Sequence, residues 1–147
     1  MVELRDPQKL AELSSRLKPS ERADPDALVA AALEALRLSA HENAAALLDA
    51  ALLSDPRSAK AWSARGMLEE RQANDPGAIL AYETALAIDD TDSLSALSLA
   101  QLQARAGQAD RARSLVNWLI LEDAVPLDVR QKAHALKRQL DAERAAL

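Results

Sequence analysis

The sequence overlays on itself when it is shifted by 34 residues. Three successive segments, which start at Pro25, Ala59 and Ser93, place small side chains at matching positions. These matching residues are Ala32, Gly66 and Ala100, followed by Ala44, Ala78 and Ala112. A period of this length is typical of solenoids in which each repeat is one pair of helices. The repeat therefore predicts a stack of helical hairpins, an architecture that favours a binding scaffold over an enzyme.

Composition agrees with a helical stack. Apolar residues make up 49% of the 147-residue chain while aromatic residues make up only 2%, so the core is expected to consist mainly of alanine and leucine. Small side chains let helices approach closely, whereas aromatic and β-branched residues would dominate a sheet protein. The chain has no cysteine, which excludes disulfides and thiolate chemistry and fits a reducing compartment.

The charge balance bears on the class of partner. The net charge is -5 and the isoelectric point is near 5.0, whereas non-specific binding of nucleic acid needs clustered positive charge. Charges at Glu3, Arg5 and Asp6 stand where a signal peptide would have an apolar run. No segment reaches the ~18 apolar residues of a membrane span. We expect a soluble cytoplasmic protein that binds neither nucleic acid nor membrane.

Helix starts are marked by Asp-Pro pairs at 6–7, 24–25, 55–56 and 75–76. An aspartate can cap free amides while proline occupies the first helical position, so three pairs are expected to open helices and the pair at 55–56 to end one. Gly107 and Asn74 are expected in left-handed turn positions. The predicted helices cover 7–18, then hairpins of 25–38 with 41–54, 59–72 with 76–89 and 93–106 with 109–122, and finally 127–145.

These signals predict three parts of the chain. Residues 1–24 form an N-terminal helix and linker, residues 25–126 form three repeats, and residues 127–147 form a last helix that has no second helix to pair with. The repeats cover 25–58, 59–92 and 93–126. The last helix is amphipathic, with Val129, Ala133, Leu136 and Leu140 at helical spacing. Its expected role is to cap the open end of the stack.

The middle repeat resembles a tetratricopeptide repeat (TPR), a helical hairpin with Trp and Gly on its first helix and an Ala-x-x-x-aromatic motif on its second. The residues that carry the resemblance are Ala61, Trp62, Gly66, Ala78, Tyr82, Ala85 and Leu86. The first and third repeats are degenerate copies in the same phase, and the Thr-Pro-Leu-His signature of ankyrin repeats is absent. The resemblance implies an all-α, right-handed solenoid of three TPR-like hairpins with an extra helix at each end. Gly66 would let the hairpin's two helices press together beside Tyr82.

The resemblance further implies a concave groove, lined by the first helices, that takes up an extended or helical peptide without a cofactor. The residues expected to face this groove are Val29, Leu33, Leu36, Arg37, Lys60, Ser63, Met67, Glu70, Arg71, Leu94, Leu97, Gln101 and Arg105. We expect a non-enzymatic scaffold or adaptor that binds a protein or peptide. One alternative is a chaperone of type III secretion translocators, a set similar in size and layout. Another is a structural subunit that oligomerises through its convex or C-terminal face.

Arg37, Arg71 and Arg105 share one position of the repeat. A column of guanidinium groups beside an apolar strip fits an amphipathic ligand with acidic groups. The alternative is that each arginine offsets the dipole at the end of its own helix. The carboxylate clamp of chaperone-binding TPR proteins is not expected, because its positions hold Val29, Leu33, Ala64, Leu94 and Ser98.

Three further features need separate explanations. Arg65 replaces an apolar residue and is expected to pair with Glu69 one turn away. Trp118 lies off the apolar stripe of its helix, so it is expected either beneath the 127–145 helix or, with Leu121, in a self-association patch that would make the protein a homo-oligomer. The two histidines, His41 and His134, have no second ligand at metal spacing, so neither a metal site nor a catalytic group is expected.

Overall fold

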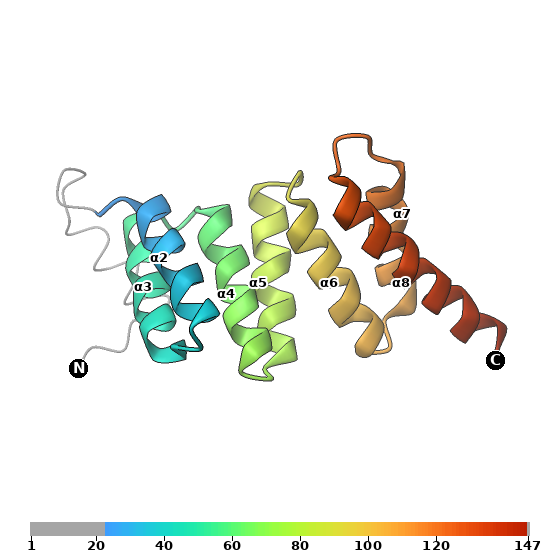
Figure 1. Cartoon of the computed structure of the whole chain (residues 1–147), viewed down its shortest axis with the longest axis horizontal. Coiled ribbons are helices and arrows are strands. Elements are labelled where there is room, and N and C mark those ends of the chain that lie inside the picture. Colours follow the sequence, from blue (N-terminus) through green and yellow to red (C-terminus); the bar gives the residue numbers. More distant parts are fainter. Residues whose placement is uncertain (1–22, 147) are drawn as a thin grey trace. The chain divides into compact units, whose positions relative to one another are not determined.

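The computed structural model describes residues 23–146, and every regular element in this range is an α-helix (Figure 1). The expected helix over 7–18 and the Asp-Pro pair at 6–7 lie outside the described residues. The helices are α2 (Pro25–Arg37), α3 (His41–Ser54), α4 (Ala59–Arg71), α5 (Asp75–Ile88), α6 (Ser93–Arg105), α7 (Ala109–Leu121) and α8 (Leu127–Ala145). All seven agree with the predicted ranges to within one residue at each end.

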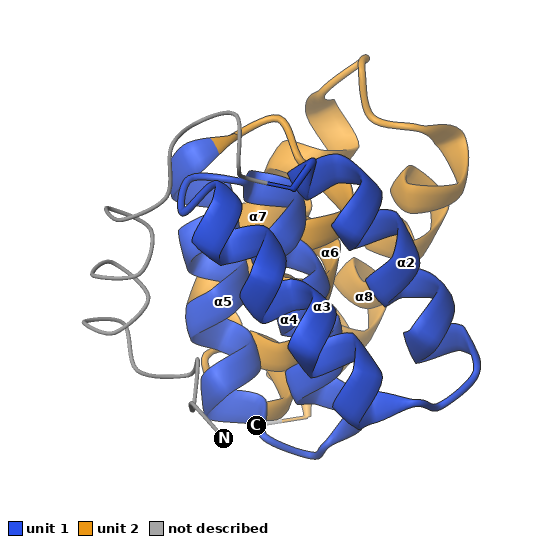
Figure 2. Ribbon diagram, turned by 90° about the vertical axis from the view of Figure 1, so that its left-hand side faces the viewer, with its two compact units in different colours: residues 1–88 blue, residues 89–147 orange. Residues whose placement is uncertain are grey.

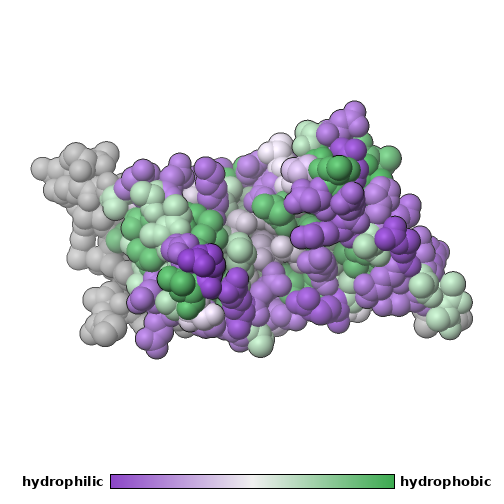
Figure 3. Space-filling view, viewed as in Figure 1, coloured by the Kyte–Doolittle hydropathy of each residue, from purple (hydrophilic) through white to green (hydrophobic). Residues whose placement is uncertain are grey.

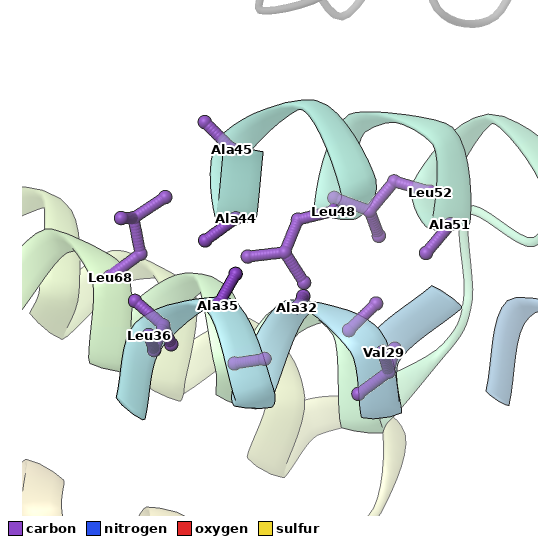
Figure 4. Close-up of a cluster of buried hydrophobic side chains, with 12 residues drawn as sticks. Val29, Ala32, Ala35, Leu36, Ala44, Ala45, Leu48, Ala51, Leu52 and Leu68 are labelled. Carbon is purple, nitrogen blue, oxygen red and sulfur yellow. The ribbon is translucent and has the colours of Figure 1, made fainter. Parts of the chain in front are cut away.

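The chain divides into two compact units, residues 1–88 and 89–147 (Figure 2). In the first unit, α2 pairs with α3 and α4 pairs with α5, and α4 also packs against both α2 and α3. The core between α2, α3 and α4 consists of alanine, leucine and valine side chains, as the composition predicted (Figure 4). The first unit is therefore two helical hairpins stacked through small side chains.

Gly66 and Tyr82 are in close contact between α4 and α5 of the second hairpin. A Cβ atom at Gly66 would lie 2.7 Å from the Tyr82 ring, which is closer than atoms of two side chains can approach. The Tyr82 side chain is buried, and its hydroxyl donates to Glu70 Oε1 at 2.7 Å. The predicted packing role of Gly66 is confirmed, because only a residue without a side chain admits the ring there.

Arg65 pairs with a different partner from the one that the sequence predicted. Its guanidinium donates to the Asp49 carboxylate of α3, and both side chains are about nine-tenths buried. Glu69 instead accepts a hydrogen bond from Asn74 Nδ2 at 2.7 Å. The expected pair with Glu69 was wrong because a guanidinium buried at this depth needs a charged partner in the core, and α3 supplies one.

Each hairpin turn contains one residue in the left-handed conformation, at the same position of the repeat. These residues are Ser39 with φ 60°, Ala73 with φ 58° and Gly107 with φ 79°. After each of them an amide donates to a carbonyl five residues earlier, as in Ala40 to Ala35 at 2.8 Å and Gln108 to Gln103 at 2.8 Å. This arrangement satisfies the free carbonyls at the helix end. The prediction for Gly107 is confirmed, whereas in the second turn the left-handed residue is Ala73 and not Asn74.

The helix starts also follow the sequence with one difference. Asp24 accepts from the Asp26 amide at 3.1 Å ahead of Pro25, as predicted, and Ser58 caps α4 by accepting from Ala61 at 3.1 Å. At the pair 75–76, the side chain that accepts an amide is Asn74, from Gly77 at 3.2 Å. The polar residue before Asp75 therefore takes the capping role expected of the aspartate.

The second unit consists of the hairpin α6/α7 and the last helix α8, which packs against both. The buried stripe of α8 is Val129, Ala133, Leu136 and Leu140, as predicted. Arg113 of α7 holds the far end of α8, since its Nη2 lies 3.3 Å from the Leu140 carbonyl and 3.6 Å from the Asp141 carboxylate. Within its unit, α8 thus contacts α6 and α7 in the way that α4 contacts α2 and α3.

Candidate functional site

The first helices of the first unit, α2 and α4, pack side by side and carry two partly exposed apolar side chains in one register. Leu33 on α2 is 40% exposed and Met67 on α4 is 37% exposed. Figure 3 shows hydrophobic surface over the α2 part of this unit, with hydrophilic side chains beside it. We call the surface formed by the exposed residues of α2 and α4 the first-helix face. Leu33 and Met67 form an apolar strip on the first-helix face, and the fold leaves this strip partly exposed.

Polar groups surround this strip. Lys60 Nζ lies 4.0 Å from the Asp26 carboxylate, and both side chains are largely exposed, so they contribute charge to the rim rather than stability. Ser63 is half-buried on the same helix. Glu70 accepts the hydrogen bond from the Tyr82 hydroxyl, so this carboxylate also supports the hairpin.

Two arginines of the predicted column, Arg37 and Arg71, belong to the first unit and have different contacts there. Arg37 lies in the last turn of α2 and pairs with Glu34, with Nη2 2.5 Å and Nε 3.0 Å from the two carboxylate oxygens. This bidentate pair lowers the pKa of Glu34 and raises that of Arg37. Arg71 donates from Nη1 to the Leu36 carbonyl at 2.6 Å, at the C-terminal end of the neighbouring α2. In the first unit, therefore, both guanidinium groups have structural partners.

Three residues that were expected to face the groove are buried. Val29 and Leu36 belong to the core between α2, α3 and α4, and their side chains are 4% and 1% exposed. Leu97 of α6 is 5% exposed. The prediction that these three residues line a ligand site was wrong because it assigned too wide an apolar face to each helix.

In the second unit, α6 and α8 together line a hollow of about 590 Å³. Gln101 and Arg105, two of the expected groove residues, lie on its α6 wall. The other residues around it are Ala104 of α6 and Lys132, Ala135, Leu136, Gln139 and Glu143 of α8. Leu94, near the start of α6, is 63% exposed. The hollow offers two cations, two amides and the Glu143 carboxylate, which accepts from Gln139 Nε2 at 3.2 Å. Its cations and the Gln101 amide can hold a carboxylate or a backbone carbonyl.

Sequence reasoning missed the contribution of α8 to this hollow. The signal was available, because α8 begins at Leu127, one repeat length after α6 begins at Ser93. A helix at that position is the first helix of an incomplete fourth repeat, and its groove-facing positions hold Lys132, Gln139 and Glu143. The last helix therefore packs against α6 and α7 and also forms one wall of this hollow.

Trp118 and Leu121 lie at the end of α7. Trp118 is half-buried and lines a second hollow of about 370 Å³. The other residues around this hollow, none of them from α8, are Asp90, Thr91, Ser93, Glu122, Ala124 and Val125. Leu121 is 81% exposed. The Trp118 indole is therefore not fully buried beneath α8, and it is not fully exposed either.

Candidate chemistry is sparse in the described part of the chain. Residues 23–146 contain no group of three or more His, Cys, Asp or Glu side chains that could hold a metal ion. His41 is half-buried at the start of α3, and His134 is exposed on α8. None of the described helices is both long and apolar enough to cross a membrane.

Comparison with known proteins identifies the fold. No protein-family model and no curated protein matches the sequence. Among solved structures, the type III secretion translocator chaperone SycD of Yersinia enterocolitica is 12% identical, with 97% of this chain and 98% of SycD covered at a TM-score of 0.75. SycD in complex with a peptide of the translocator YopD is 15% identical over 82% of this chain and 92% of that chain, with a TM-score of 0.70. A thermophilic TPR protein of Thermus thermophilus is 24% identical over 89% of this chain and 65% of its own, with a TM-score of 0.58.

At these identities the similarity defines the fold and nothing finer. The chain has the all-α, TPR-like fold of helical hairpins that its repeat predicted. The fold is found here in structures described as secretion chaperones and as a TPR protein. Binding of a partner by this chain is a separate question, which depends on the residues of the first-helix face.

Proposed function

We propose that this chain is a non-enzymatic adaptor that captures an extended or helical segment of a partner protein on the first-helix face. The observation that carries the proposal is the exposure of Leu33 and Met67 in one register of two packed helices. The hydrophobic effect favours a partner that covers these side chains, because apolar surface that the fold leaves in water is buried on binding. A helix or extended segment presents apolar residues at the spacing needed to cover both.

Polar groups would orient the bound segment. In the second unit, Gln101 and Arg105 share a hollow with Lys132, and these donors favour acidic or carbonyl oxygen beside the one carboxylate of the lining, Glu143. We infer that the segment is amphipathic, with its apolar side on Leu33 and Met67 and with acidic groups on its other side. Arg37 and Arg71 each have a partner within the first unit.

The narrower form of the proposal is a chaperone of a secretion translocator, acting in the cytoplasm. Two structures with the same fold support it: SycD is bound to a peptide of YopD, and PcrH is bound to the chaperone-binding region of PopD. SycD matches this chain over nearly its whole length, so the similarity extends past the repeats to the last helix. The absence of cysteine fits a reducing compartment.

Affinity capture from the native lysate, quantified by mass spectrometry, tests where the partner binds. We expect Met67→Asp and Leu33→Asp to lose the captured partner, because a buried aspartate without a counter-ion opposes binding. Leu80→Asp is the matched control: Leu80 is 66% exposed on the second helix α5, and its replacement should leave capture unchanged. Loss of the partner in Leu80→Asp with retention in Met67→Asp would move the binding surface to the second helices and reject the proposal.

A further inference from the structure

A hollow beside Trp118 lies within the second unit and shares no residue with the first-helix face. Its walls are Asp90, Thr91 and Ser93, which precede and begin α6, Trp118 of α7, and Glu122, Ala124 and Val125, which lie between α7 and α8. Its volume is about 370 Å³. This space can admit a large side chain together with part of the backbone that carries it.

The repeat architecture does not require an indole at position 118. The residues in the same register of α3 and α5 are Ala50 and Thr84, so the second helix of a repeat packs without an aromatic group there. The buried stripe of α7 is Ala112, Val116 and Leu119, and Trp118 lies outside it and is half-buried. Trp118 is therefore a feature of this hollow and not of the helical stack.

The segments that frame the hollow carry only negative charge. Residues 89–92 and 122–128 contain six acidic side chains and no lysine or arginine. Asp89 and Asp92 are engaged by Thr91 and Ser95. In the described part of the chain, the carboxylates of Asp90 and Glu122, both on the wall of the hollow, have neither a hydrogen-bond partner nor a counter-ion.

The loop that forms one wall is held in place. Arg130 of α8 donates from Nη2 to the carbonyl oxygens of Glu122, Asp123 and Val125 at 3.0, 3.1 and 3.2 Å. Val125 is buried, and its amide donates to the Glu122 carbonyl at 3.2 Å. The hollow is therefore preformed, which lowers the cost of ordering it when a ligand binds.

We propose that this hollow is a second docking site, which takes an arginine or lysine side chain from a basic, apolar segment of a partner protein. The indole face attracts a cation, and Asp90 and Glu122 can accept hydrogen bonds from it. Leu121 and Leu127, at the two ends of the loop, are 81% and 68% exposed and offer contacts for apolar neighbours of that side chain. Figure 3 shows hydrophobic surface next to hydrophilic side chains over the α7–α8 end of this unit. The positive charge of this ligand is opposite to that of the acidic groups favoured by the hollow between α6 and α8.

Fluorescence anisotropy of a labelled peptide tests the site. The probe is a synthetic eight-residue peptide of alternating leucine and arginine, compared with the same peptide in which citrulline replaces arginine. We expect saturable binding of the arginine peptide that weakens as salt is raised, and binding about tenfold weaker for the neutral citrulline peptide. Trp118→Ala, and the double variant Asp90→Asn with Glu122→Gln, should each lower the affinity about tenfold or more. The double variant keeps the shape of both side chains, so its fold is unaffected.

Two controls separate this site from other causes. Glu42→Gln with Glu83→Gln removes the same charge from exposed positions of the first unit and should leave the affinity within about twofold. Met67→Asp should also leave the affinity for the arginine peptide unchanged. A failure of this proposal can therefore be told apart from a failure of the proposed function. Equal affinity for both peptides, or undiminished affinity in the double variant, would overturn the proposal. A Trp118-dependent rise in mass with protein concentration would also overturn it, because a second copy would then occupy the hollow.

Discussion

Single small residues determine how closely the helices of a hairpin approach. At Gly66 the Tyr82 ring occupies the space of a Cβ atom, and the ring cannot retreat because it is buried and its hydroxyl is bound by Glu70. The sequence predicted this contact because Gly, Tyr and their spacing match the TPR pattern. Packing contacts of this kind are readable from sequence, since they require particular residue sizes at fixed separations.

Gly66→Ala is expected to destabilise the protein by about 1–2 kcal/mol. Overpacking costs about 1–3 kcal/mol, and the better helix propensity of alanine offsets up to about 1 kcal/mol of it. Denaturant unfolding monitored by circular dichroism measures the change. In a Tyr82→Leu background the same substitution should be neutral or stabilising. An equal loss in both backgrounds would show that the ring is not the cause.

For single residues, the depth of burial and the partner of an ion pair were less predictable from the sequence than the close contact at Gly66. Val29, Leu36 and Leu97 lie on the correct helices, but register alone does not tell how far into the core a side chain reaches. The pair between Arg65 and Asp49 joins two hairpins, and local spacing on one helix favoured Glu69 instead. Contacts between elements depend on how the helices are rotated against one another, and the sequence does not specify that rotation.

At the scale of elements, the three hairpin turns share one backbone geometry with different residues. Ser39, Ala73 and Gly107 all have positive φ, yet only glycine adopts this conformation without strain. Sequence reasoning found Gly107 and missed the other two positions, because neither serine nor alanine signals a left-handed turn. The repeat length carried the missing information, since the three positions are one period apart.

Ala73→Gly and Ser39→Gly are each expected to stabilise the protein by about 0.5 kcal/mol. The free energy gained by relieving left-handed strain in the folded state exceeds the free energy that the extra conformational entropy of glycine gives to the unfolded chain. Gly107→Ala is the reverse test, and it isolates the backbone effect because a Cβ atom there meets no atom within 4 Å. It should lower the unfolding free energy by a similar amount. Thermal unfolding of the three variants checks the signs, and a loss of stability in Ala73→Gly would contradict the strain argument.

At the scale of the whole molecule, the sequence predicted the fold well and the candidate site in part. A 34-residue period with capping signals determines helix number, length and order because each signal acts locally. The site depends on which side chains remain exposed after hairpins stack, so Leu33 and Met67 were found and the contribution of α8 was not. Recognising Leu127 as the start of the first helix of a fourth repeat would have predicted the contribution of α8.

The central claim is that a partner segment binds the first-helix face, formed by α2 and α4. Amide chemical-shift mapping of the isotope-labelled protein, titrated with the segment recovered from the captured partner, tests this claim most directly. We predict that the largest shifts in the first unit fall on α2 and α4, with Leu33 and Met67 among them and the exposed positions of α3 and α5 unmoved. Shifts concentrated on α3, α5 and α7, with Leu33 and Met67 unchanged, would contradict it.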